Sequence, residues 1–229
     1  MLRAILFDFN GVLVDDEPIH YALFARVLGE EGIVLSEEVY YRQYLSLDDR
    51  GCFTQALRAA GKSAGAAEVV RLTTRKASYY REQIRREGYP FFPGARELVR
   101  SAATAGLTLG VVSGALREEV EAACDQAGLS RFFKVLVTAE DVSEGKPDPQ
   151  GYLRGIEALN SQPPLPDRLF HPHEVLAIED SPGGLQAAAA AGLATLGVAH
   201  TYPADGLVAD RVVRSLAGLS IEELLRISG

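Results

Sequence analysis

Residues 5–18 read ILFDFNGVLVDDEP and contain the pattern that decides the fold. Residues Ala4–Phe7 form a short apolar run ending at Asp8, which is typical of a strand buried on both faces of a parallel sheet. Asn10 comes two residues later and directly precedes Gly11, which predicts a turn. A catalytic site at a strand end of this kind usually has two carboxylates. Here Asp8 supplies one, and Asn10 places an amide where the second would be.

Four similar apolar runs occur later in the chain, at residues 107–112, 134–138, 174–178 and 194–198. Helical patterns lie between them, at residues 95–105, 116–127, 149–159 and 182–191. Three of these helices are followed by glycine, as is common at helix C-termini. The alternation predicts right-handed βαβ units and a doubly wound, Rossmann-like parallel sheet in an α/β fold.

The segment between the first run and residue 92 has a different pattern. Helical periodicity covers residues 19–31, 37–45, 51–60 and 66–87, without a convincing strand. We therefore expect residues 1–15 and 93–229 to form the α/β core, and residues 16–92 to form an inserted all-helical cap. Proline-containing hinges are expected at residues 15–18 and 92–94.

Composition limits the classes of partner. The net charge of -8 argues against non-specific binding to nucleic acid or to an anionic membrane, because phosphate surfaces repel it. No signal-peptide pattern opens the chain, and the weakly polar residues 185–199 are too short to span a bilayer. Cys52 and Cys124 lie far apart and are interpreted as reduced, buried thiols. These features favour a cytoplasmic protein that is a monomer or a homodimer.

Polar residues follow several of the predicted strands, where open α/β sheets bind their ligands. They are Asp8 with Asn10, Ser113, Lys146 in a later loop, and the pair Glu179 and Asp180. Each has an ordinary alternative, such as a turn residue, a helix cap or a loop lysine. Their recurrence at one predicted sheet edge favours a common site.

These residues lie in four motifs: DFNGVLVDDEP, VVSGA, GKPDP and IEDSPGG. In order and spacing the motifs resemble those of the haloacid dehalogenase superfamily, in particular its helical-capped branch of phosphatases and β-phosphoglucomutases. The resemblance covers essentially the whole chain. It implies that Asp8 is the nucleophile that forms an aspartyl phosphate. It also implies that Lys146 neutralises charge, and that Ser113 and the Gly114 N–H bind phosphoryl oxygens.

The resemblance also implies a metal cofactor. Mg²⁺ would be held by Asp8, by the backbone carbonyl of Asn10 and by Asp180, with Glu179 behind it.

Asn10 departs from the family pattern. Phosphatases of the family carry an aspartate there, which protonates the leaving oxygen and later deprotonates water; an amide cannot exchange that proton. The acid–base step, worth about 10²–10⁴-fold, should therefore be weak. The amide fits a slow phosphatase, a substitution that traps a complex, or a site that mainly binds. Because Asn-Gly pairs deamidate readily, some molecules would also regain a carboxylate.

The cap is expected to select the substrate. His20 follows the first hinge, where a hexose-phosphate mutase of the family also has a histidine, and a surface position is the alternative. Residues 45–51 resemble the family's specificity loop, in which Arg50 would pair with a second anionic group and Asp49 would meet hydroxyls. A solvated turn is the alternative for this loop.

Together these features predict a Mg²⁺-dependent phosphatase of a small phosphorylated metabolite. A catalytically impaired phosphometabolite-binding or regulatory protein is one alternative. A phosphoglucomutase-type enzyme is another, less favoured because a mutase needs the missing acid–base group even more. The helical insert argues against a receiver-like signalling domain.

Overall fold

The computed structural model describes residues 1–45 and 47–227. The chain divides into two compact units. One combines Met1–Asp15 with Tyr89–Gly229, and the other is Asp16–Gly88. We call them the sheet unit and the helical unit, and each is described by itself.

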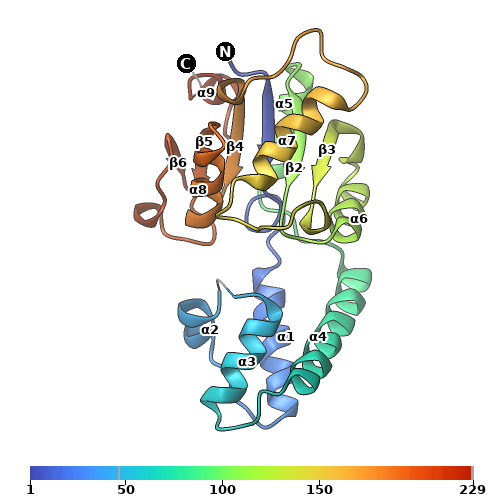
Figure 1. Ribbon diagram of the computed structural model, residues 1–229, viewed down its shortest axis with the longest axis vertical. Helices are drawn as coiled ribbons and strands as arrows, with labels where there is room; N and C mark the ends of the chain where they lie inside the picture. Colours follow the sequence, from blue (N-terminus) through green and yellow to red (C-terminus); the bar gives the residue numbers. More distant parts are fainter. Residues whose placement is uncertain (46, 228–229) are drawn as a thin grey trace. The chain divides into compact units, whose positions relative to one another are not determined.

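The sheet unit contains a six-stranded parallel sheet in the order β3-β2-β1-β4-β5-β6 (Figure 1). The strands are β1 (Ala4–Phe7), β2 (Thr108–Val112), β3 (Phe133–Val137), β4 (Val175–Glu179), β5 (Ala194–Val198) and β6 (Arg211–Val213). The predicted α/β fold with a doubly wound parallel sheet is confirmed. The edge strand β6 was not predicted, because three half-buried residues are too few to give a pattern.

Strand β1 occupies the interior of the sheet, and all four of its residues are buried. Phe7 is in register with Val111 of β2 and with Ile178 of β4. The carboxyl ends of these three strands therefore meet at one edge, which brings the residues that follow them together.

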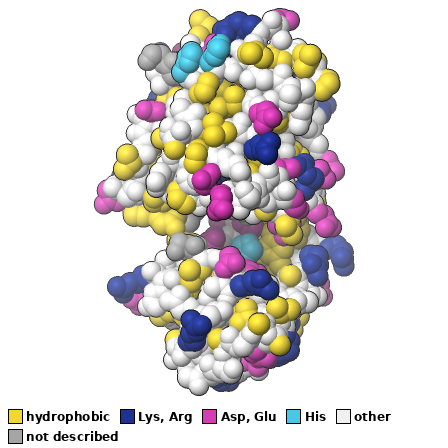
Figure 2. Space-filling model, in the orientation of Figure 1, with side chains coloured by type: hydrophobic (Ala, Val, Ile, Leu, Met, Phe, Trp, Pro, Cys, Tyr) yellow, Lys and Arg dark blue, Asp and Glu magenta, His cyan; other side chains and the backbone are white. Residues whose placement is uncertain are grey.

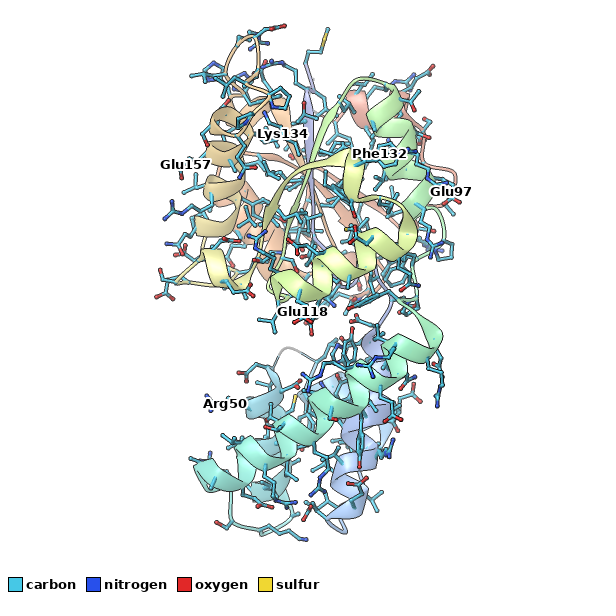
Figure 3. All side chains as sticks on the ribbon, turned by 90° about the vertical axis from the view of Figure 1, so that its right-hand side faces the viewer. Arg50, Glu97, Glu118, Phe132, Lys134 and Glu157 are labelled. Carbon is cyan, nitrogen blue, oxygen red and sulfur yellow. The ribbon has the colours of Figure 1, made fainter. Side chains whose placement is uncertain are left out.

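Helices cover both faces of the sheet. Figure 3 shows Glu157 of α7 and Glu97 of α5 on opposite sides of it. Apolar residues of α7 and α8 share a core with the strands, including Tyr152, Leu159, Ala187 and Ala188. The helices of this unit are α5 (Ala95–Thr104), α6 (Arg117–Ala127), α7 (Gln150–Ser161), α8 (Pro182–Ala190) and α9 (Ile221–Leu225). The short 3₁₀ turns are η1 (Ser130–Phe132), η2 (Ala139–Asp141), η3 (Pro172–Glu174) and η4 (Ala204–Gly206).

The helical unit consists of α1 (Glu17–Glu30), α2 (Glu37–Gln43), α3 (Asp49–Ala59) and α4 (Ala66–Glu87). Two of these helices begin at side-chain caps: Ser36 accepts a hydrogen bond from Val39 N–H, and Asp48 accepts one from Gly51 N–H. The unit has its own hydrophobic core, with Phe24, Val27, Leu28, Phe53, Leu57 and Leu72 among its buried members. The four helices are therefore held together by a core of their own.

The surface carries charges of both signs. Acidic and basic side chains are interspersed on the face that Figure 2 shows, without an extended basic patch on that face. Within the described residues, no helix is both long and apolar enough to cross a membrane.

Candidate active site

Asp8 lies in the turn that follows β1. Its backbone N–H donates to the carbonyl of Ile178 at 2.9 Å, so the ladder to β4 continues one residue beyond the strand. The N–H groups of Leu13 and Val14 then both donate to the carbonyl of Phe9, which closes the turn. The Asp8 side chain is buried at the sheet edge.

The turn requires glycine at position 11. Gly11 has a φ of +77°, which L side chains rarely adopt. A Cβ there would also lie 1.9 Å from Oδ2 of Asp180, which comes from the end of β4. Both the backbone and the close approach of Asp180 therefore exclude a side chain.

Lys146 reaches the sheet edge from the loop before α7. Its Nζ donates to Oδ1 of Asp8 at 2.6 Å and to the carbonyl of Val112 at 3.1 Å, and it lies 2.6 Å from Oε1 of Glu179. Burial alone would lower the pKa of Lys146, but Asp8 and Glu179 raise it above its ordinary value. Lys146 is therefore a fixed positive charge between two carboxylates.

Three buried carboxylates share this small volume. Oxygen atoms of Asp8, Glu179 and Asp180 lie within 4.8 Å of one another. Burial, followed by repulsion from Glu179, raises the pKa of Asp8; burial, followed by repulsion from Asp8 and Glu179, raises that of Asp180. One lysine does not balance three acids, so the oxygen-rich cluster fits a divalent cation such as Mg²⁺.

Ser113 and Gly114 lie at the end of β2. The Ser113 N–H donates to the carbonyl of Val137, and its buried hydroxyl accepts from the N–H of Ala115 at 3.0 Å. Gly114 is exposed, with open space where a side chain would be. The structure thus brings Ser113 and Lys146 to the strand ends that carry Asp8 and Asp180.

Asn10 is half-buried in the turn after β1 and bridges to Val14 in the backbone. The amide stands two residues after Asp8, where its neutral side chain can hydrogen-bond but cannot transfer a proton. The N–H of the next residue, Gly11, donates to the carbonyl of Val14 at 2.9 Å.

Sequence reasoning missed three residues of this site. The buried Tyr152 of α7 donates its hydroxyl to Oε1 of Glu179 at 2.6 Å, and His200 and Thr201 approach from the loop after β5. Burial and the Glu179 charge raise the pKa of Tyr152 well above its ordinary value, so it stays a donor. Tyr152 looks like any apolar residue of a helix, and no motif marks the other two.

The predicted cap residues belong to the helical unit. His20 and Asp49 meet at Lys76, whose Nζ lies 2.8 Å from His20 Nδ1 and donates to Asp49 Oδ1 at 2.5 Å. Lys76 is buried and was not predicted, because a helical lysine normally faces solvent. Arg50 is exposed at the start of α3 (Figure 3), and residue 46 of the predicted specificity loop lies outside the described residues.

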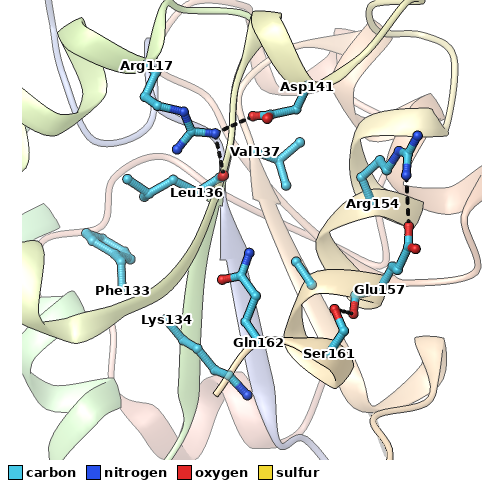
Figure 4. A pocket seen from close by; sticks show the side chains of 11 residues that line it. Arg117, Phe133, Lys134, Leu136, Val137, Asp141, Arg154, Glu157, Ser161 and Gln162 are labelled. Atoms are coloured by element: carbon cyan, nitrogen blue, oxygen red, sulfur yellow. Dashed lines mark hydrogen bonds and ion pairs between the residues drawn. The ribbon is translucent and has the colours of Figure 1, made fainter. Parts of the chain in front are cut away.

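A hollow of about 590 Å³ lies between β3 and α7 (Figure 4). Its walls include Arg117, Lys134, Arg154 and Glu157, and none of the predicted site residues lines it. This hollow therefore lies apart from the predicted site residues.

The chain is similar to known proteins over most of its length. A family model described as haloacid dehalogenase-like hydrolase matches residues 2–192. Validoxylamine A 7'-phosphate phosphatase of Streptomyces hygroscopicus subsp. limoneus is 29% identical over 223 residues, which cover 94% of this chain and 95% of the relative. Phosphorylated carbohydrates phosphatase of Thermotoga maritima is 27% identical over 202 residues, 87% of each chain.

A solved structure of CbbY from Rhodobacter sphaeroides is similar over 98% of this chain and 99% of its own, with a TM-score of 0.79 and 27% identity. That protein is a variant with asparagine in place of an aspartate, in complex with xylulose-1,5-bisphosphate.

Proposed function

Because the chain belongs to the haloacid dehalogenase-like hydrolase family, we propose that it is a Mg²⁺-dependent phosphatase of a small phosphorylated metabolite. The reaction would pass through an aspartyl phosphate on Asp8. The observation that carries the proposal is the group of Asp8, Lys146, Glu179 and Asp180 at one sheet edge. The names of the relatives, which act on phosphorylated carbohydrates and on validoxylamine phosphate, support a sugar-like substrate.

In the first step, a carboxylate oxygen of Asp8 attacks phosphorus, and the bond from phosphorus to the leaving oxygen breaks. Lys146 orients the carboxylate and offsets charge on the phosphoryl group, while Ser113 and the Gly114 N–H donate to its oxygens. Water then attacks the phosphorus of the intermediate, which releases inorganic phosphate and restores Asp8.

Asp8, Asp180 and the backbone carbonyl of Asn10 would hold Mg²⁺, and Glu179 would support the site through Lys146 and Tyr152. Bound Mg²⁺ supplies positive charge beside the phosphoryl oxygens.

Asn10 weakens the two proton transfers of this scheme. The leaving oxygen needs a proton as its bond to phosphorus breaks, and the attacking water must lose one; an amide does neither. Esters whose leaving group is already acidic need little protonation, so they should be cleaved best.

We assign substrate selection to the predicted cap, residues 16–92. The exposed Arg50 suits a second anionic group of a substrate. His20 and Asp49, which are both held by Lys76, suit hydroxyl groups.

A second candidate function is suggested by Asn10 itself. A chain that keeps the phosphate and metal groups but lacks the acid–base group can bind a phosphometabolite without turning it over. The CbbY variant, in which an asparagine replaces an aspartate, carries a bound sugar bisphosphate.

A leaving-group series on the chain and on Asn10→Asp tests these proposals. Asn10→Asp should raise kcat for alkyl phosphates by about 10²–10⁴-fold, and much less for acetyl phosphate or acidic aryl phosphates. Asp8→Ala is the control and should abolish turnover of every ester.

Residual turnover by Asp8→Ala would refute the nucleophile assignment. If neither the chain nor Asn10→Asp cleaves any ester, while both bind sugar phosphates, the binding protein is the correct function.

A further inference from the structure

The loop after β5 contacts the turn that carries Asn10 and Gly11. Strand β5 is not a neighbour of β1, because β4 lies between them. Nevertheless, Nδ1 of His200 lies 2.9 Å from the carbonyl oxygen of Gly11. A carbonyl only accepts, so Nδ1 carries the proton and donates it.

This contact completes a pair of restraints on Gly11. Its N–H donates to the carbonyl of Val14, and its carbonyl accepts from His200. The Gly11 N–H shares a peptide plane with the carbonyl of Asn10, so fixing one orients the other. Without such restraints, glycine can rotate more freely than any other residue.

The imidazole of His200 is itself held in place. It stacks on the ring of Phe92, with ring centres 3.8 Å apart and planes 14° apart. The Phe92 N–H donates to the carbonyl of Leu13, in the same turn. The His200 backbone is fixed by a hydrogen bond from its N–H to the carbonyl of Val198.

Thr201, the next residue, lies beside Asp180 and Gly11. Its hydroxyl lies beside the Asp180 carboxylate, toward which a hydroxyl can act only as a donor. A Cβ placed on Gly11 would lie 1.9 Å from Asp180 Oδ2 and 2.8 Å from Thr201 Oγ1. Gly11, the Asp180 carboxylate and the Thr201 hydroxyl therefore lie close together.

We propose that His200 and Thr201 are positioning residues, which hold the Asn10 carbonyl and the Asp180 carboxylate in the geometry that binds a divalent cation. The inference rests on the proposed function. Its physical basis is that hydrogen bonds behind metal ligands fix their orientation, and their loss typically lowers metal affinity about 10–100-fold.

The test measures Mn²⁺ binding to the intact chain by electron paramagnetic resonance of the free ion, with Mg²⁺ as competitor. Thr201→Val removes the hydroxyl at nearly constant shape and should weaken Mn²⁺ binding about tenfold. Thr201→Ser restores the donor and should stay within about threefold of the parent. His200→Phe keeps a ring on Phe92 but loses the donor to Gly11, and should weaken binding about tenfold.

Thr195→Val is the matched control. Thr195, on β5, donates its hydroxyl to Asp210 at 3.0 Å, and neither residue belongs to the group of Asp8, Glu179 and Asp180. This variant should lose thermal stability like Thr201→Val and keep the Mn²⁺ affinity of the parent.

Unchanged Mn²⁺ affinity in Thr201→Val and His200→Phe would overturn this inference and would leave the proposed function standing. A weakened affinity in Thr195→Val equal to theirs would show a general effect of stability, and would also overturn it. A parent chain that binds no Mn²⁺ would overturn the metal part of the proposed function, and the inference with it.

Discussion

Asn10 and Gly11 form a dipeptide that deamidates readily in a flexible chain, because the Gly11 nitrogen can attack the amide. In the fold, that nitrogen donates its hydrogen to the carbonyl of Val14, and Gly11 is held at a φ of +77°. The turn that contains Asn10 therefore protects its amide from deamidation.

We predict that the folded chain keeps the amide at position 10, whereas the chain unfolded in urea loses it. Peptide mass spectrometry after long incubation in mildly alkaline buffer measures both. Equal conversion in the two samples would contradict the protective role of the turn. It would also restore the idea that regained carboxylate supports activity.

Gly184, in the first turn of α8, is a second glycine at which an added Cβ would clash with an acidic residue of the site. A Cβ there would lie 2.0 Å from Oε2 of Glu179, the partner of Lys146 and Tyr152. The N–H of Gly184 also donates to Ser181, which caps the helix.

We predict that Gly184→Ala lowers the free energy of unfolding by about 1–3 kcal/mol, as overpacking does, and sharply lowers turnover of aryl phosphates. Gly183→Ala is the control, because nothing lies within 4 Å of its added Cβ. Urea unfolding and initial rates measure both variants. Full activity in Gly184→Ala would show that Glu179 can move without consequence.

At the scale of elements, α7 depends on its neighbouring strand. Lys134 of β3 donates its Nζ to the carbonyls of Leu159 at 2.7 Å and Pro164 at 2.8 Å. The last carbonyls of a helix lack partners within the helix, so a lysine there satisfies them. Helix α7 also carries Tyr152, which donates a hydrogen bond to Glu179. The contact of Lys134 with α7 therefore also helps to hold Tyr152 beside Glu179.

We predict that Lys134→Met lowers the free energy of unfolding by about 1 kcal/mol, because these carbonyls lose a charged donor. Arg154→Met, on the same side of α7, should cost less than about 0.5 kcal/mol, since its pair with Glu157 is exposed. Urea titration compares the two. Equal effects would mean that the contact of Lys134 with α7 adds nothing beyond an ordinary surface charge.

At the scale of the whole molecule, two separate cores each contain one cysteine. Cys52 is buried in the helical unit and Cys124 in the sheet unit. Burial raises the pKa of each thiol to about 12, so neither reacts readily in the folded chain.

We predict that the two thiols become reactive at different urea concentrations, Cys52 first, because the smaller unit buries less surface. Labelling Cys124→Ala and Cys52→Ala variants with a thiol reagent reports each unit separately. Coincident exposure of both thiols would show that the units unfold as one.

The sequence by itself determined the parallel sheet and the edge of the sheet at which Asp8, Glu179 and Asp180 lie. Apolar runs that end in polar residues require parallel strands buried on both faces, and parallel strands bring their carboxyl ends together. Asp8, Ser113 and Asp180 therefore had to approach one another, and the amide at position 10 was visible as a departure from the motif.

Only the tertiary structure decided which side chains support that edge. Tyr152, His200 and Thr201 carry no local signal, because their contacts depend on which helix face and which loop pack against the acids and the turn after β1. Strand periodicity reports burial, but it does not report the partner of a buried polar atom. That partner is set by contacts between segments far apart in the chain.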